Sequence, residues 1–182
     1  MLKALILIPT LALAQNAPTG LGRPATQQEI DRLNLTVYPD GKGLPKGSGS
    51  AATGLAPYKA KCAVCHNDKG EGRQAQYPAL VGGIGTLTKS QAVKTVGSYW
   101  PYATTVFDYI RRSMPFDHPR SLAADEVYGV TALILHWNGI IAEKDELNER
   151  NLAAVKMPNR DGFFTYKGPL VDPRKPKAAK PR

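Results

Sequence analysis

The two cysteines of the chain, Cys62 and Cys65, are separated by two residues and followed directly by His66. Zinc would need a fourth ligand, and no second cysteine pair or histidine cluster supplies one. A thioredoxin-like redox pair would begin a helix within a βαβ unit, and the sequence has no such pattern. A c-type haem site uses every group, because the two thiols bond to the porphyrin and His66 binds the iron. The motif therefore predicts one covalent haem c.

The sixth ligand of the iron decides between an electron carrier and a catalyst. Four residues beyond the motif can supply a sulfur or imidazole ligand: Met114, Met157, His118 and His136. Met114 stands between two predicted helices, and Pro115 places it on a loop. Met157 is better explained by packing, His136 by a structural role on a helix, and His118 by surface exposure. We predict Met114 as the second axial ligand.

Aromatic and basic residues lie between the two predicted ligands. Tyr99, Trp100 and Tyr102 either donate hydrogen bonds to the haem propionates or fill the pocket. Of these, Tyr99 and Trp100 are predicted to contact the cofactor. Three roles are open for Arg111 and Arg112: neutralising the haem propionates, binding a partner, or forming a solvated helix end, of which we favour the last.

The elements that position these groups are helices. Thr26 and Glu29 form a capping box before a short helix that ends near Leu33. Further helices are predicted from Gly54 to Cys62, from Tyr102 to Arg112, and from a Ser121 cap to about Asn138. Residues 67–98 are glycine-rich and read as loops with short helical pieces. No segment alternates convincingly like a strand, so the fold class is predicted to be all-α.

The N-terminus indicates export. Residues 1–3 are basic, residues 4–13 are apolar, and small residues precede a predicted cleavage after Ala14. We expect a signal peptide at 1–14 and a periplasmic protein. No apolar run reaches 18 residues, which excludes a membrane-spanning helix at the level of sequence.

The net charge of +9 is concentrated at the C-terminus. Residues 167–182 carry a net charge of +5 and four prolines, and we expect them to form a flexible tail. About +3 remains for the body of the protein, where no segment interleaves aromatic and basic side chains. Nucleic-acid binding is therefore not expected.

Several motifs of residues 51–140 together resemble a class I cytochrome c. They are Gly54-x-x-x-Tyr58 before the haem motif, Pro78-x-Leu80, Met114-Pro115 and a leucine-rich last helix. The resemblance implies that the carbonyl of Pro78 accepts the Nδ1–H of His66. It also implies that the first and last helices cross at Gly54 and Tyr58 against an aromatic residue. Leu133 stands at the matching position, so Tyr128 or Trp137 would have to substitute.

A narrower resemblance covers nearly all of the chain that follows the predicted cleavage after Ala14. Its motifs are Gly22-Arg23-Pro24-Ala25-Thr26, Glu29-Ile30, Pro39-Asp40-Gly41, Gly43-Leu44-Pro45 and residues 97–105, 107–116 and 157–163. Together they resemble the cytochrome subunit of molybdenum-dependent sulfur-oxidising enzymes, meaning Sox sulfane dehydrogenases and sulfite dehydrogenases. The resemblance implies a molybdopterin partner that passes single electrons to the haem, and a downstream acceptor such as another cytochrome c.

We therefore expect five regions: a signal peptide (1–14), an N-terminal arm with a short helix (15–50), a cytochrome c domain (51–141), a C-terminal arm (142–166) and a basic tail (167–182). The two arms are predicted to embrace the partner subunit, since a bare class I domain needs neither. Two other functions stay open. One is a free-standing periplasmic shuttle, and the other is a haem enzyme with a displaceable sixth ligand, acting as a peroxidase or thiosulfate dehydrogenase.

Overall fold

The computed structural model describes residues 22–73 and 76–165. The predicted signal peptide and basic tail lie outside these residues. The chain divides into two units, residues 1–34 and 35–182, which are described separately below.

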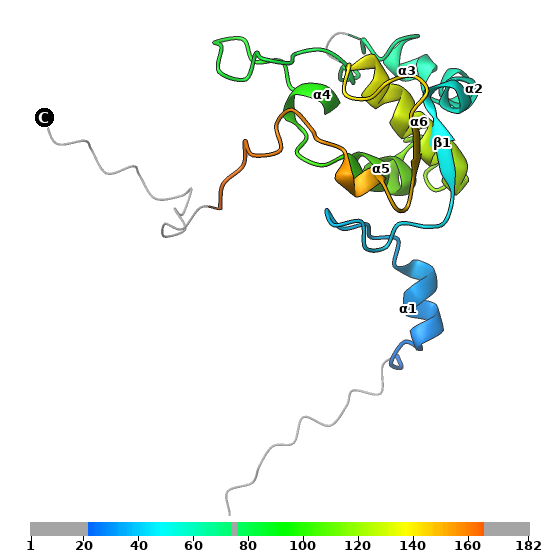
Figure 1. Ribbon diagram of the computed structural model, residues 1–182. Coiled ribbons are helices and arrows are strands. Elements are labelled where there is room, and N and C mark those ends of the chain that lie inside the picture. Colours follow the sequence, from blue (N-terminus) through cyan, green and yellow to red (C-terminus); the bar gives the residue numbers. More distant parts are fainter. Residues whose placement is uncertain (1–21, 74–75, 166–182) are drawn as a thin grey trace, which may run out of the picture. The chain divides into compact units, whose positions relative to one another are not determined.

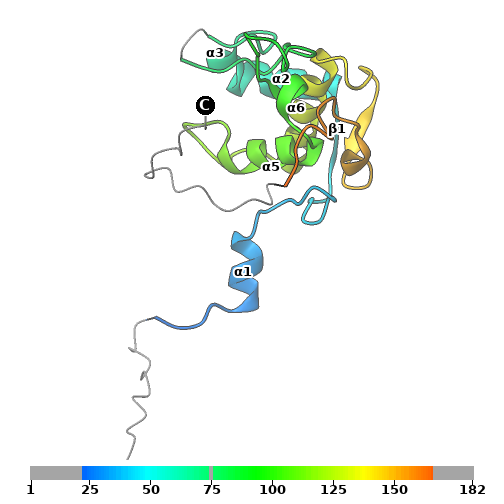
Figure 2. The ribbon, with the colours of Figure 1, turned by 90° about the vertical axis from the view of Figure 1, so that its left-hand side faces the viewer.

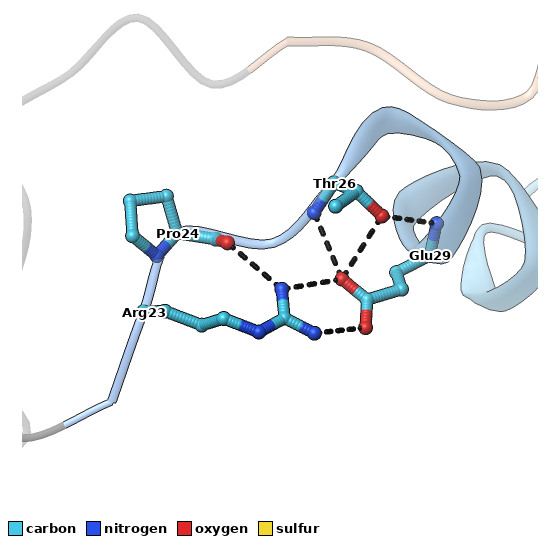
Figure 3. A network of polar contacts seen from close by, with 4 residues as sticks. All are labelled: Arg23, Pro24, Thr26 and Glu29. Carbon is cyan, nitrogen blue, oxygen red and sulfur yellow. Dashed lines mark hydrogen bonds and ion pairs between the residues drawn. The ribbon is translucent and has the colours of Figure 1, made fainter.

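The described part of the first unit, residues 22–34, contains helix α1 (Gln27–Leu33), which is capped as the sequence predicts (Figure 1). The hydroxyl of Thr26 accepts the amide of Glu29, and the Glu29 carboxylate accepts the amide of Thr26 at 2.9 Å. Arg23 extends the network, donating to Glu29 at 2.9 Å and to the carbonyl of Pro24 at 3.1 Å (Figure 3). The guanidinium of Arg23 and the amide of Thr26 lower the pKa of Glu29 to about 2.

The second unit is mostly helical, which confirms the all-α prediction (Figures 1 and 2). Its helices are α2 (Ala51–Lys61), α3 (Ala63–His66), α4 (Val96–Tyr99), α5 (Ala103–Ser113), α6 (Ala124–Trp137) and a 3-10 turn, η1 (Leu152–Ala154). A small antiparallel sheet of β1 (Ser48–Ser50) and β2 (Glu146–Asn148) was not predicted. Its three-residue strands are too short to show an alternating pattern.

The start of α6 differs from the prediction. Ser121 is not the cap; the N-cap residue is Ala123, and the helix begins at Ala124. The carboxylate of Glu126 accepts the amide of Ala123 at 2.9 Å, so the capping side chain comes from the first turn of the helix and not from a serine before it.

Helices α2 and α6 cross at two glycines. A Cβ on Gly54 would lie 2.0 Å from the carbonyl oxygen of Gly129, so only glycine permits this approach. One turn later Tyr58 is buried and packs edge-on against Trp137, with 4.8 Å between ring centroids. Of the two aromatics considered for this crossing, Trp137 therefore contacts Tyr58.

Helix α6 lies between α2 and α5 in both ribbon views (Figures 1 and 2). On the α5 side, the rings of Phe107 and Tyr128 are 4.5 Å apart and fully buried. The apolar residues of α5 recur at helical spacing and face this core: Ala103, Val106, Phe107 and Ile110.

Segments on either side of residues 51–141 join the same core. Strand β1 pairs with β2, with Ser48 opposite Asn148. Four residues of these segments are buried in the common hydrophobic cluster: Val37, Leu147, Leu152 and Met157. Part of each predicted arm thus belongs to the chain's own fold, and contact of the arms with a partner stays a prediction.

In the part of the chain that the structure describes, no helix has the length and apolar character needed to cross a membrane.

Candidate haem site

The cysteine motif lies where α2 ends and α3 begins. The amide of Cys62 donates to the carbonyl of Tyr58 at 2.8 Å, and that of His66 donates to the carbonyl of Cys62 at 2.9 Å. Both cysteines are half-buried free thiols. Burial raises the pKa of Cys62 to about 11, which keeps its thiol neutral near pH 7. A thiolate at Cys62 is therefore disfavoured.

His66 is oriented by the loop that follows it. Its Nδ1 lies 3.1 Å from the carbonyl oxygen of Pro78. A carbonyl oxygen can only accept, so Nδ1 is the donor and carries the proton. The lone pair of the ring is then on Nε2, which is the nitrogen free to bind a metal.

A glycine and an asparagine fold this loop back onto the motif. Gly72 has a φ of +73°, and a Cβ there would lie 2.6 Å from the amide of Ala79. Asn67 has a φ of 61°, and its side chain donates to the carbonyl of Gly72 at 2.6 Å. The carbonyl of Asn67 in turn accepts the hydroxyl of Tyr58 at 2.9 Å. The α2–α6 crossing and the Pro78 loop are therefore connected through one buried tyrosine.

Met114 is the residue that ends α5. It is half-buried, extended (φ −120°, ψ 146°), and packs against the hydrophobic core. Its amide donates to the carbonyl of Ile110 at 3.0 Å, which continues the helical pattern for one more residue. Cys62 and Trp100 are also half-buried against the same core, so residues from three parts of the sequence converge there.

The other candidate ligands are engaged elsewhere or exposed. Met157 is 3% exposed and packs in the core, as the packing interpretation predicts. The Nδ1 of His136 lies 3.4 Å from the carbonyl oxygen of Ile141. His118 is exposed, and its amide donates to the carbonyl of Pro115 at 3.0 Å.

Tyr99 and Trp100 contact later segments of the chain. The ring of Tyr99 packs edge-on against Phe163 at 5.2 Å, and its carbonyl accepts the side chain of Asn159 at 2.7 Å. Trp100 packs edge-on against Tyr109 of α5, at 5.6 Å. These contacts hold both residues in place, while their contact with the cofactor stays a prediction.

The two arginines lie in the last turn of α5, where Arg112 is exposed to solvent, and each also binds another residue of the chain. Arg112 pairs with Asp108, and its Nε lies 2.9 Å from the carboxylate. Arg111 points to the carbonyl oxygens of Leu35 and Gly43, each at 3.5 Å. Asp108 was not predicted as a functional residue, although a carboxylate four residues before an arginine on the same helix signals such a pair.

Asn138, at the end of α6, was also overlooked. Its side chain donates to the carbonyls of Leu80 and Ile134 at 3.2 and 2.8 Å, and it accepts the amide of Gly82 at 3.0 Å. It thereby ties the segment after Pro78 to α6. Its position directly after a predicted helix could have indicated that its side chain bonds to backbone carbonyls.

The donor set fits a covalently attached haem. Within residues 22–73 and 76–165, no group of three or more His, Cys, Asp or Glu side chains can hold a metal ion, so zinc finds no complete site there. Two free thiols, an imidazole with Nε2 available and a half-buried thioether are the groups that attach and ligate haem c.

Residues 51–138 match the sequence model of a family described as cytochrome c. The chain is similar to a chain in the crystal structure of the sulfane dehydrogenase SoxCD from Paracoccus pantotrophus. The identity is 39%, the TM-score is 0.76, and the match covers 91% of this chain and 86% of that chain.

A second solved structure is the thiosulfate dehydrogenase TsdBA from Marichromatium purpuratum. Here the identity is 25% and the TM-score 0.36, over 47% of this chain and 17% of that chain, and we infer nothing from it. No curated protein matches significantly.

Proposed function

The chain belongs to the cytochrome c family, and we propose that it is a monohaem electron-transfer subunit of a periplasmic sulfur-oxidising enzyme. Its electrons would come from a molybdenum subunit that oxidises sulfite or protein-bound sulfane sulfur. The observation that carries the proposal is the 39% identity to a chain of SoxCD along 91% of this chain. That similarity extends well beyond the residues that match the cytochrome c family.

Four residues would hold the cofactor. Cys62 and Cys65 would form the two thioether bonds, His66 would ligate the iron through Nε2, and Met114 would ligate it through its sulfur. When bound, the haem supplies a one-electron Fe(III)/Fe(II) couple. Pro78 keeps the proton of His66 on Nδ1 and fixes the orientation of the ring.

His/Met ligation supports a carrier over a catalyst. A thioether ligand raises the reduction potential, which suits an acceptor downstream of a molybdenum centre. A filled sixth position also leaves no open site for a substrate. On its own the chain would make and break no substrate bond, and the chemistry of sulfur would belong to the partner.

Phe116 provides a candidate contact for the partner. It is 86% exposed and follows Met114 by two residues. Exposed aromatic side chains are enriched in protein interfaces. A partner that covers Phe116 would approach the chain beside Met114, the proposed second ligand of the iron.

Purification of the native protein from periplasm tests the proposal. We expect the chain to elute in a complex that contains molybdenum, with one haem for each copy of the chain. A free-standing shuttle would elute alone without molybdenum. A haem enzyme with a displaceable ligand would lack the near-infrared sulfur-to-iron band in its ferric state, so the two alternatives give different results.

A further inference from the structure

Residues 35–45 form a strap that crosses one face of α5. Three side chains of the helix bind it, at intervals of four and three residues and so on one face: Thr104, Asp108 and Arg111. They contact the backbone of the strap at four residues: Leu35, Val37, Pro39 and Gly43.

Asp108 is the central residue of this contact. It is 6% exposed, yet both of its oxygens are satisfied. Oδ1 accepts the amide of Val37 at 2.9 Å, and Oδ2 accepts the Nε of Arg112 at 2.9 Å together with a second bond from Nη2. A buried carboxylate is tolerated only when paired in this way, and such charge-assisted bonds are strong.

The strap and α6 hold α5 from different sides. Phe107 packs against Tyr128 of α6, while Asp108 binds the strap. The last turn carries Arg112, and the amide of Met114 bonds to the carbonyl of Ile110 in that same turn. The position of the Met114 backbone thus depends on the end of α5, and one face of α5 is hydrogen-bonded to residues 35–45.

We propose that Asp108, through its bonds to Arg112 and Val37, is a positioning residue that keeps Met114 bound to the iron. The inference rests on the proposed His66/Met114 ligation. A thioether is a neutral, weak ligand, so the fraction of iron it binds depends on how accurately the backbone presents it. Loosening the strap would shift the equilibrium toward a displaced Met114 without affecting the thioether bonds of Cys62 and Cys65.

Asp108→Asn in the full-length haem protein tests this role. Asparagine keeps the shape and an acceptor for Val37 but removes the charge that binds Arg112. We expect a weaker sulfur-to-iron band in the ferric protein. We also expect added imidazole to bind the iron about ten-fold more tightly, because a displaced thioether no longer competes. Arg112→Gln should show the same changes, and Arg112→Lys should restore part of the band.

Glu29→Gln is the matched control, because it breaks another arginine–carboxylate pair, that with Arg23, outside residues 35–182. It should leave the band and imidazole affinity unchanged. If Asp108→Asn and Arg112→Gln keep the wild-type band and affinity and only unfold more easily, the pair is merely structural and the inference is wrong. Should Asp108→Asn fail to fold, the arginine variants decide. A wild-type protein without the band would instead contradict the ligation itself.

Discussion

At the scale of single residues, the orientation of His66 depends on one hydrogen bond. Because Pro78 lacks an amide proton and offers only its carbonyl, the imidazole must donate through Nδ1 and present Nε2. The loop that carries Pro78 is held by Gly72 and Asn67, both in left-handed backbone conformations. The orientation of the His66 ring is therefore determined by backbone geometry up to twelve residues away.

The first prediction concerns the two methionines. Met114→Ala should keep covalent haem but lose the sulfur-to-iron band and lower the reduction potential, since the thioether ligand is removed. Met157→Leu should retain both properties, because Met157 packs in the core and leucine conserves its volume. Near-infrared absorption and a redox titration check this. A band that survives in Met114→Ala would assign the ligand to another residue.

At the scale of elements, two helices approach at a pair of glycines. The contact between Gly54 and Gly129 lets Tyr58 reach Trp137 and, through its hydroxyl, the loop of the candidate haem site. The crossing of α2 and α6 is therefore tied to the site.

The second prediction follows from that crossing. Gly54→Ala should lower the free energy of unfolding by about 2 kcal/mol or more, because the new methyl group would overlap a backbone carbonyl. Ala56→Ser adds an atom at an exposed position of the same helix and should change it by about 0.5 kcal/mol or less. Denaturant unfolding of both variants measures the difference. If the two variants lose the same free energy of unfolding, close contact between α2 and α6 at Gly54 does not contribute to stability.

The third prediction concerns the pH dependence of α1. Charged Glu29 stabilises the capping network, and its pKa is lowered from about 4.5 to about 2. The stabilisation is therefore complete above about pH 4.5 and is lost as the pH falls through about 2. Amide NMR signals of Gln27–Leu33 should report this loss, and Glu29→Gln should abolish the pH dependence. An unchanged titration in the variant would assign it to another group.

Elements with local signals were predicted well from the sequence. The capping box before α1 and the helical spacing of α2 and α5 lie within short segments, and each helix was found within three residues of its expected bounds. Strands β1 and β2 were missed because their pairing joins residues about a hundred positions apart. The bonds of Asp108 to residues 35–45 were missed for the same reason, since only tertiary contact gives that carboxylate its partner.

At the scale of the whole molecule, segments outside residues 51–141 complete the core. Leu147, Leu152 and Met157 follow the last long helix and are buried, and Tyr99 and Tyr102 contact Asn159 and Arg160. Residues after 141 thus share the buried core of the predicted cytochrome c domain. The net charge of +9 does not indicate what the protein binds, whereas the two cysteines predict a covalent haem.

The fourth prediction tests this larger core. Leu152 is fully buried, so Leu152→Ala should cost about 2–5 kcal/mol in the free energy of unfolding. Phe164 is 87% exposed, and Phe164→Ala should cost about 0.5 kcal/mol or less despite removing more atoms. Thermal unfolding of the two haem-loaded variants measures the loss of stability in each. A similar loss in both would show that the C-terminal segment is not packed as described.

The fifth prediction concerns the function of the assembled complex. Adding sulfite or a sulfane donor to the molybdenum-containing complex that we propose should reduce one haem per copy of this chain, as followed by absorption of the ferrous haem. The isolated chain should remain ferric under the same conditions, because it lacks the centre that oxidises sulfur. A haem that stays ferric while the complex turns over its sulfur substrate would contradict the proposed role as electron acceptor.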